Sequence, residues 1–245
     1  MFIRALWGIY NNPKRMYRRR SKIDNDIKMV SHNIYQPPFM TYVFGSDNYN
    51  YLVDQGFSCK LIDNKPIVWD MNTQQFRHKF EVFKYALEDY GKFVFLDWDM
   101  AFIKPLPRNF WDTLSKKAPI QAILRIYHNK KALWRKEKPR TIPCGSFVYI
   151  REKKIGDDLI KYWEAMGKPW GEEVVIAKYI DDKMGGFDMD KYWDYYEPLY
   201  FKFQNMYSEE RMKTKIPLIE HFNCYSVKSL LSRINTKKCP AWLKK

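Results

Sequence analysis

Two aspartates, Asp97 and Asp99, follow one of the most apolar segments of the chain, in the run FVFLDWDMAF. In a β-strand, residues two apart point to the same side, so this spacing predicts two carboxylates that face one way. Converging carboxylate oxygens suit a hard divalent cation such as Mg²⁺ or Mn²⁺, which commonly completes its shell with water and phosphate oxygens. The pair therefore predicts a metal site for a ligand that carries a diphosphate.

The alternative interpretation of this pair is a solvated turn, and its apolar surroundings argue against that. Apolar residues at 93–96 precede Asp97, and Met100 to Ile103 follow Asp99. Acidic groups at the end of a buried strand are costly unless something neutralises them. Open α/β sheets bind ligands at the carboxyl ends of their strands, and this strand would deliver both carboxylates there.

The rest of the chain alternates short apolar runs with amphipathic stretches. This pattern favours an α/β fold with a central, mostly parallel sheet flanked by helices. Strands are predicted over residues 2–9, 41–44, 57–62, 92–103, 120–127 and 147–150. Helices are predicted over 49–55, 76–90, 157–166 and from about 172 to 180. Because no internal repeat or linker is visible, we expect a single domain over residues 1–245.

The charge balance points to a polyanionic partner. The net charge of +15 arises from 43 basic and 28 acidic residues. Nucleic acid, an anionic membrane surface or a phosphorylated glycan would each fit. No apolar run reaches the length of a membrane span, the N-terminal residues lack the order of a secretory signal, and the four cysteines are widely spaced. We therefore expect free thiols and a cytoplasmic protein, in a bacterium or a phage-infected host.

With these features the sequence resembles the GT-A glycosyltransferases, in which a hydrophobic strand delivers a DxD motif to a metal ion and a nucleotide-sugar diphosphate. The resemblance spans roughly Phe2 to Leu231, and the DWD segment is its most specific part. It implies a metal-dependent glycosyltransferase with Mn²⁺ or Mg²⁺ as cofactor and a nucleotide sugar, first of all a UDP-sugar, as donor. It also implies that residues 1–110 bind the donor, while 111–245 form the acceptor side and a C-terminal metal and phosphate segment.

The resemblance further implies roles for residues outside the DWD segment. Glu172 or Glu173, at a helix start, would contact the donor sugar or act as base, although acids there are also favoured by the helix dipole. His221 would complete the metal shell, or be a hydrogen-bonded core histidine, and Lys228 would bind phosphate, although the glycine usual between them is missing. The other residues expected at the donor are Ala5, Trp7, Gly8, Asp47, Arg77, Lys79, Trp98, Gly145 and Ser146. Arg77 and Lys79 would alternatively be surface charges.

Two basic segments with interleaved aromatic residues, 14–22 and 129–140, suggest the acceptor. Such segments can follow a phosphate backbone and stack on bases. Their expected polyanion-binding residues are Arg18, Arg19, Arg20, Lys130, Lys131, Trp134 and Arg135. The leading hypothesis is DNA with hydroxymethylated bases, the substrate of sugar-transfer enzymes that some bacteriophages encode, and the target base would have to flip out. The alternative is lipopolysaccharide or another envelope glycan, reached through peripheral contact with an anionic leaflet.

Two other classes stay open on sequence grounds. A metal-dependent nuclease or nucleotidyltransferase also uses paired aspartates, but would need a third carboxylate, for which Asp188 and Asp190 are the best candidates. A non-catalytic nucleic-acid-binding module would explain the positive charge but not two aspartates at the end of a buried strand. The sequence also leaves open whether transfer inverts or retains the anomeric configuration.

Overall fold

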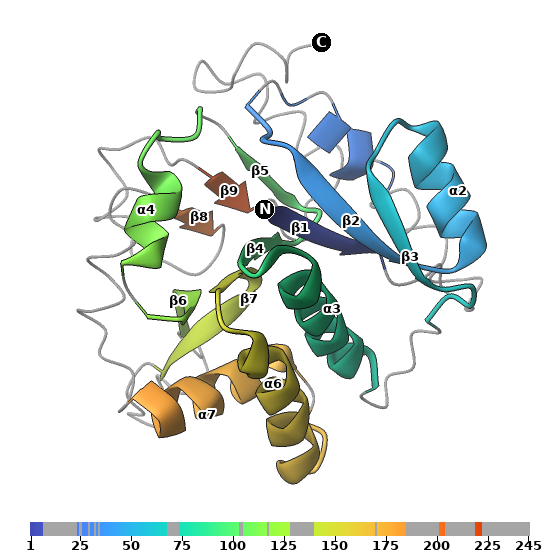
Figure 1. The fold of residues 1–245 in the computed structure, drawn as a ribbon. Helices are drawn as coiled ribbons and strands as arrows, with labels where there is room; N and C mark the ends of the chain where they lie inside the picture. Colours follow the sequence, from blue (N-terminus) through green and yellow to red (C-terminus); the bar gives the residue numbers. More distant parts are fainter. Residues whose placement is uncertain are drawn as a thin grey trace.

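A six-stranded sheet forms the centre of this computed structural model, in the strand order β3-β2-β1-β4-β7-β6 (Figure 1). The structure describes residues 1–6, 24, 26–28, 30–31, 33, 35–67, 74–102, 105–116, 118–127, 140–169, 171–184, 201–203 and 219–221. The strands β1 (Phe2–Leu6), β2 (Phe39–Phe44), β3 (Cys59–Asp63) and β4 (Phe93–Leu96) run parallel to one another. The strands β6 (Ile120–Tyr127) and β7 (Arg140–Ile150) extend the sheet in antiparallel pairing. The predicted α/β fold with a mostly parallel sheet is confirmed.

A second, three-stranded sheet continues from the end of β4. It consists of β5 (Met100–Phe102), β9 (Ile219–His221) and β8 (Phe201–Phe203), in the order β5-β9-β8. Residues 97–99 form the turn between β4 and β5, so the chain passes directly from one sheet to the other through this turn. The DWD segment therefore lies at the junction of the two sheets.

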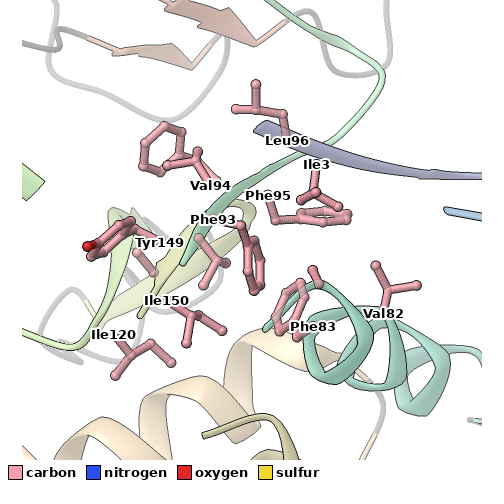
Figure 2. Close-up of a cluster of buried hydrophobic side chains, with 14 of the residues drawn as sticks. Ile3, Val82, Phe83, Phe93, Val94, Phe95, Leu96, Ile120, Tyr149 and Ile150 are labelled. Atoms are coloured by element: carbon pink, nitrogen blue, oxygen red, sulfur yellow. The ribbon is translucent and has the colours of Figure 1, made fainter. Parts of the chain in front are cut away.

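Helices cover both faces of the central sheet because its parallel strands are apolar on both sides. On one side α3 (Gln74–Tyr90) packs against α6 (Lys153–Ala165), and α7 (Glu172–Met184) packs against α6 and β7. Phe83 of α3 lies 5.5 Å from Phe93 and 5.2 Å from Phe95 between ring centres. Figure 2 shows these β4 rings directed toward α3 and the intervening Val94 directed away, as strand alternation requires.

The opposite face carries a smaller cluster beneath α2 (Ser46–Asp54). Leu52 of α2 packs there with Leu6, Val43 and Trp98. A short helix, α4 (Phe110–Ser115), follows β5 and adds Phe110 and Leu114 to the main core. No helix in the described ranges has the length and apolar character that crossing a membrane requires.

Most predicted elements are present, and several differ in their bounds. The predicted strand 120–127 matches β6, and the predicted helix 76–90 is α3 with two more residues at its start. The predicted strand 92–103 is wrong as one element, because the Met100 amide donates to the Asp97 carbonyl at 3.1 Å and closes a turn. Asp97 and Asp99 are therefore neighbours in a turn, so strand alternation does not set their directions. The strand predicted at 147–150 begins earlier, at Arg140.

We predict that Gly156→Ala destabilises the protein, although alanine has the higher helix propensity. Gly156 is buried in α6, and a β-carbon there would lie 2.8 Å from the Lys84 Cα of α3. Backbone atoms cannot rotate away, so the helices must separate, at a cost of about 1–3 kcal/mol. Urea unfolding would measure the change, with the exposed α6 variant Lys161→Ala as control. An unchanged or increased free energy of unfolding would contradict the close α3–α6 contact.

Candidate active site at the DWD turn

The DWD turn lies at the carboxyl edge of the parallel strands, where β4 ends at Leu96. The Asp97 amide donates to the Ser146 carbonyl of β7 at 3.0 Å, which fixes the start of the turn to the neighbouring strand. The Asp97 side chain is 32% exposed, whereas Asp99 is buried. The turn thus presents one carboxylate at the surface and one below it, at the edge where α/β sheets bind ligands.

A buried arginine of β1 forms hydrogen bonds with the backbone of the turn. Arg4 of β1 is fully buried, and its guanidinium donates to the carbonyls of Asp97 and Met100 and to Oε1 of Gln36. Its charge also lies 5.2 Å from the Phe39 ring centre and 5.4 Å from that of Trp98. Burial lowers the pKa of Arg4 to about 9, and the nearby charges of Asp97 and Asp99 act in the opposite direction. The group therefore stays protonated at neutral pH, directly beneath two acidic residues.

Trp98, between the two aspartates, is turned into the core. Its indole N–H donates to the Ala5 carbonyl at 3.0 Å, and its ring meets Phe39 and Phe57 edge to face. The buried aromatic ring anchors the middle of the turn to β1. These contacts give Trp98 and Ala5, both expected at the donor, a structural role in shaping the turn.

Lys79 of α3 connects the turn to α7. Its side chain is 6% exposed, and its Nζ lies 3.3 Å from Oδ1 of Asp97 and 2.7 Å from Oε1 of Glu172. The ammonium group also lies 4.6 Å from the centre of the Phe95 ring. A buried lysine is stable only when its charge is paired, so these two carboxylates fix its position. The cluster brings together three predicted site residues, which come from the DWD turn, α3 and α7.

A bulge in β7 brings Gly145 and Ser146 to the same place. Ala122 of β6 pairs with Val148, but the next residue, Ile123, pairs with Cys144, so residues 145–147 bulge out of the pairing with β6. Bulges of this kind bend a strand and redirect its residues, often beside active sites. Here the bulge directs the Ser146 carbonyl to Asp97 and places Gly145 against the Glu172 side chain.

Of the three side chains expected to bind metal, the structure describes those of Asp97 and Asp99. Asp97 and Asp99 supply oxygen ligands of the type that Mg²⁺ and Mn²⁺ prefer. The β5–β9 register places the His221 backbone opposite Met100, the residue after Asp99. The His221 side chain lies outside the described atoms, and the described residues contain no group of three His, Cys, Asp or Glu side chains that could hold a metal. The donor set that is described fits a cation that completes its shell with ligand oxygens.

Other predicted residues lie apart from this cluster or outside the described ranges. Arg77 is exposed on α3 and pairs with Glu81, so of the two basic residues expected at the diphosphate only Lys79 reaches the turn. Asp47 is exposed in the first turn of α2, and Glu173 is half-buried beside Glu172. The predicted residues outside the described ranges are Trp7, Gly8, Arg18, Arg19, Arg20, Lys130, Lys131, Trp134, Arg135, Asp188, Asp190 and Lys228.

Sequence reasoning missed Arg4, although a signal was present. A charged residue stands in the middle of the otherwise apolar strand FIRAL, and its neighbours on both sides are buried. Such a residue needs buried acceptors. The acceptors are backbone carbonyls of the turn and a glutamine, and no sequence pattern identifies those.

Comparisons with known proteins found similarity only at the level of structure. No family model and no curated protein matches the chain. Mouse xyloside xylosyltransferase 1 is 11% identical over 91% of this chain and 97% of its own, with a TM-score of 0.47. A glycosyltransferase involved in glycosylation of the major capsid of PBCV-1 is 13% identical over 92% and 94%, with a TM-score of 0.45. The glycosyltransferase GlyE of Streptococcus pneumoniae TIGR4, apo form, is 13% identical over 99% of this chain and 59% of its own, with a TM-score of 0.41.

We predict that Arg4→Met lowers the free energy of unfolding by about 3–5 kcal/mol, because it leaves buried acceptors and acidic groups without their cation. Arg4→Lys should lose less, since it keeps the charge but cannot reach every acceptor of the guanidinium. Urea unfolding would measure both losses. The matched control is Arg77→Met on the exposed face of α3, which should cost less than about 0.5 kcal/mol. A loss below about 1 kcal/mol for Arg4→Met would show that the turn does not depend on this group.

Proposed function

We propose that the protein is a metal-dependent glycosyltransferase of the GT-A type that moves a sugar from a nucleotide sugar to an acceptor hydroxyl. The observation that supports this most directly is the DWD turn at the carboxyl edge of the sheet, with Lys79 buried between Asp97 and Glu172. Acidic metal ligands beside a fixed ammonium group suit a diphosphate, since its oxygens can bind a cation on one side and a lysine on the other.

In this proposal Asp97, Asp99 and His221 would hold Mn²⁺ or Mg²⁺. The bound metal would supply positive charge that stabilises the diphosphate as a leaving group. The chain itself prepares the two aspartates, because Arg4 binds the turn carbonyls and Trp98 anchors the turn to β1. The backbone that carries both aspartates is thus held in place before a ligand arrives, which lowers the entropic cost of binding.

Lys79 and Glu172 act on the donor in this proposal. The Lys79 ammonium, fixed over Phe95, offers a donor to a diphosphate oxygen near Asp97. One oxygen of Glu172 accepts from Lys79 at 2.7 Å, and the other is an acceptor for a hydroxyl of the donor sugar. Because Oε1 of Glu172 is occupied by the Lys79 ammonium group, we assign Glu172 the role of orienting the sugar and not that of the base. We therefore expect retention of configuration, which NMR of the product's anomeric centre would test.

We propose DNA with hydroxymethylated bases as the acceptor. The support is the net charge of +15 and the basic, aromatic segments at 14–22 and 129–140, which lie largely outside the described ranges. Basic segments with aromatic residues suit a phosphate backbone and unstacked bases. A nuclease would need a third carboxylate beside Asp97 and Asp99, and its best candidates, Asp188 and Asp190, lie outside the described ranges.

We predict that Asp99→Asn lowers sugar transfer by at least about a hundredfold and leaves folding intact. Asparagine has nearly the same shape but lacks the negative charge that makes a carboxylate a strong ligand for Mg²⁺ or Mn²⁺. The assay is hydrolysis of a panel of nucleotide sugars with Mn²⁺ or Mg²⁺, with and without DNA that contains hydroxymethylcytosine. Circular dichroism and urea unfolding of the variant check its fold.

The outcomes of this assay separate the parts of the proposal. Metal-dependent hydrolysis that DNA accelerates, with a sugar mass added to the base, would support donor and acceptor together. Hydrolysis that is indifferent to DNA would keep the enzyme class and favour envelope glycans as acceptors. Full activity of Asp99→Asn would contradict the assignment of Asp99 as a metal ligand. Cleavage of the DNA itself would favour a nuclease.

A further inference from the structure

Gly145 lies in contact with the Glu172 side chain along most of its length. A β-carbon at Gly145 would be 2.3 Å from Oε1 of Glu172, 2.6 Å from its Cγ and 2.7 Å from its Cδ. Non-bonded carbon and oxygen atoms do not approach so closely, so no side chain fits at position 145 while Glu172 keeps its place. The glycine therefore provides the space that the glutamate occupies.

Space, rather than backbone conformation, explains the glycine at this position. The described glycines with positive φ are Gly45, Gly56, Gly91, Gly167 and Gly171, and Gly145 is not one of them. The backbone at Gly145 would accept an alanine without strain. An alanine here consequently tests the contact with Glu172 and little else.

The Glu172 side chain that contacts Gly145 is also part of the candidate site. The Glu172 oxygen that a β-carbon would displace, Oε1, is the one that accepts from Lys79 at 2.7 Å, and Lys79 lies 3.3 Å from Asp97. The Glu172 side chain is 13% exposed, so it has little room to find another position. A displaced carboxylate would leave a buried ammonium group with weaker pairing and would shift it relative to the DWD turn.

We propose that Gly145 is a positioning residue for the transfer reaction, which acts by leaving the space that sets the Glu172 carboxylate against Lys79. This inference rests on the proposed glycosyltransferase function. It gives Gly145 a different role from that of a residue lining the donor. The bulge in β7 presents the glycine, and the glycine fixes the distance between the acidic residue of α7 and the lysine of α3.

The test compares Gly145→Ala in the wild-type chain with the same change in Glu172→Ala. In the wild-type chain the added methyl should lower kcat of nucleotide-sugar hydrolysis by about tenfold to a hundredfold, because small displacements of positioned groups have effects of this size. The KM for the nucleotide sugar should change by less than kcat, since the carboxylates assigned to the metal and its diphosphate belong to the DWD turn and not to the displaced Glu172. Gly156→Ala, which disturbs the α3–α6 contact away from the turn, is the control for general destabilisation and should keep its kcat below its unfolding temperature.

Urea unfolding of the four combinations gives a second readout that needs no activity. Gly145→Ala should shift the unfolding midpoint down in the wild-type chain and leave it unchanged in Glu172→Ala, where the colliding atoms are gone. An equal shift in both backgrounds would overturn the inference, and so would an unchanged kcat in an active enzyme. If the wild-type chain hydrolyses no nucleotide sugar, the proposed function fails, and the unfolding comparison still shows separately whether Gly145 acts through Glu172.

Discussion

The organisation of the site depends on a positive charge that is completely withdrawn from water. Arg4 lies in the first strand, and its guanidinium binds the carbonyls on either side of the Trp98–Asp99 pair. Burying such a group costs several kcal/mol unless each donor finds an acceptor. The turn between β4 and β5 supplies two of those acceptors, so its conformation and the burial of Arg4 are mutually dependent. The contacts that bury Arg4 in the core are thus the same contacts that fix the shape of the turn.

The acidic residues around the turn are balanced by cations from different elements. Lys79 comes from α3 and Arg4 from β1, while the carboxylates belong to the turn and to α7. Without either cation, an acidic group near the turn would be left unpaired in poorly solvated surroundings, which costs free energy. The relative positions of α3, α7 and β4 are therefore set by ion pairs as well as by apolar contacts such as Phe83 with Phe95. This is why residues 93 positions apart, Lys79 and Glu172, meet at hydrogen-bonding distance.

The sequence predicted those features that depend on local patterns. The apolar spacing of α3 and the largely apolar run of β6 are local patterns, and both elements lie close to their predicted bounds. The break at Asp97 was not predicted, because a turn flanked by apolar residues has the same composition as a continuous buried strand. The pairing of Lys79 with Glu172 and the bulge at Gly145 were also out of reach, since both depend on which strands and helices become neighbours. The residue types were enough to identify the acidic pair, whereas its arrangement in a turn could be seen only in the structure.

The position of Arg4 has a consequence for how the chain is made. The carbonyls that its guanidinium binds lie 93 and 96 residues further along the chain, and β1 pairs with β4 at a similar separation. During synthesis the first strand therefore leaves the ribosome long before its acceptors exist. Contacts of such long range make folding slow and leave apolar segments exposed in the meantime. We expect the nascent chain to depend on chaperones until about the first hundred residues have emerged, when β4 and the turn can enclose the arginine.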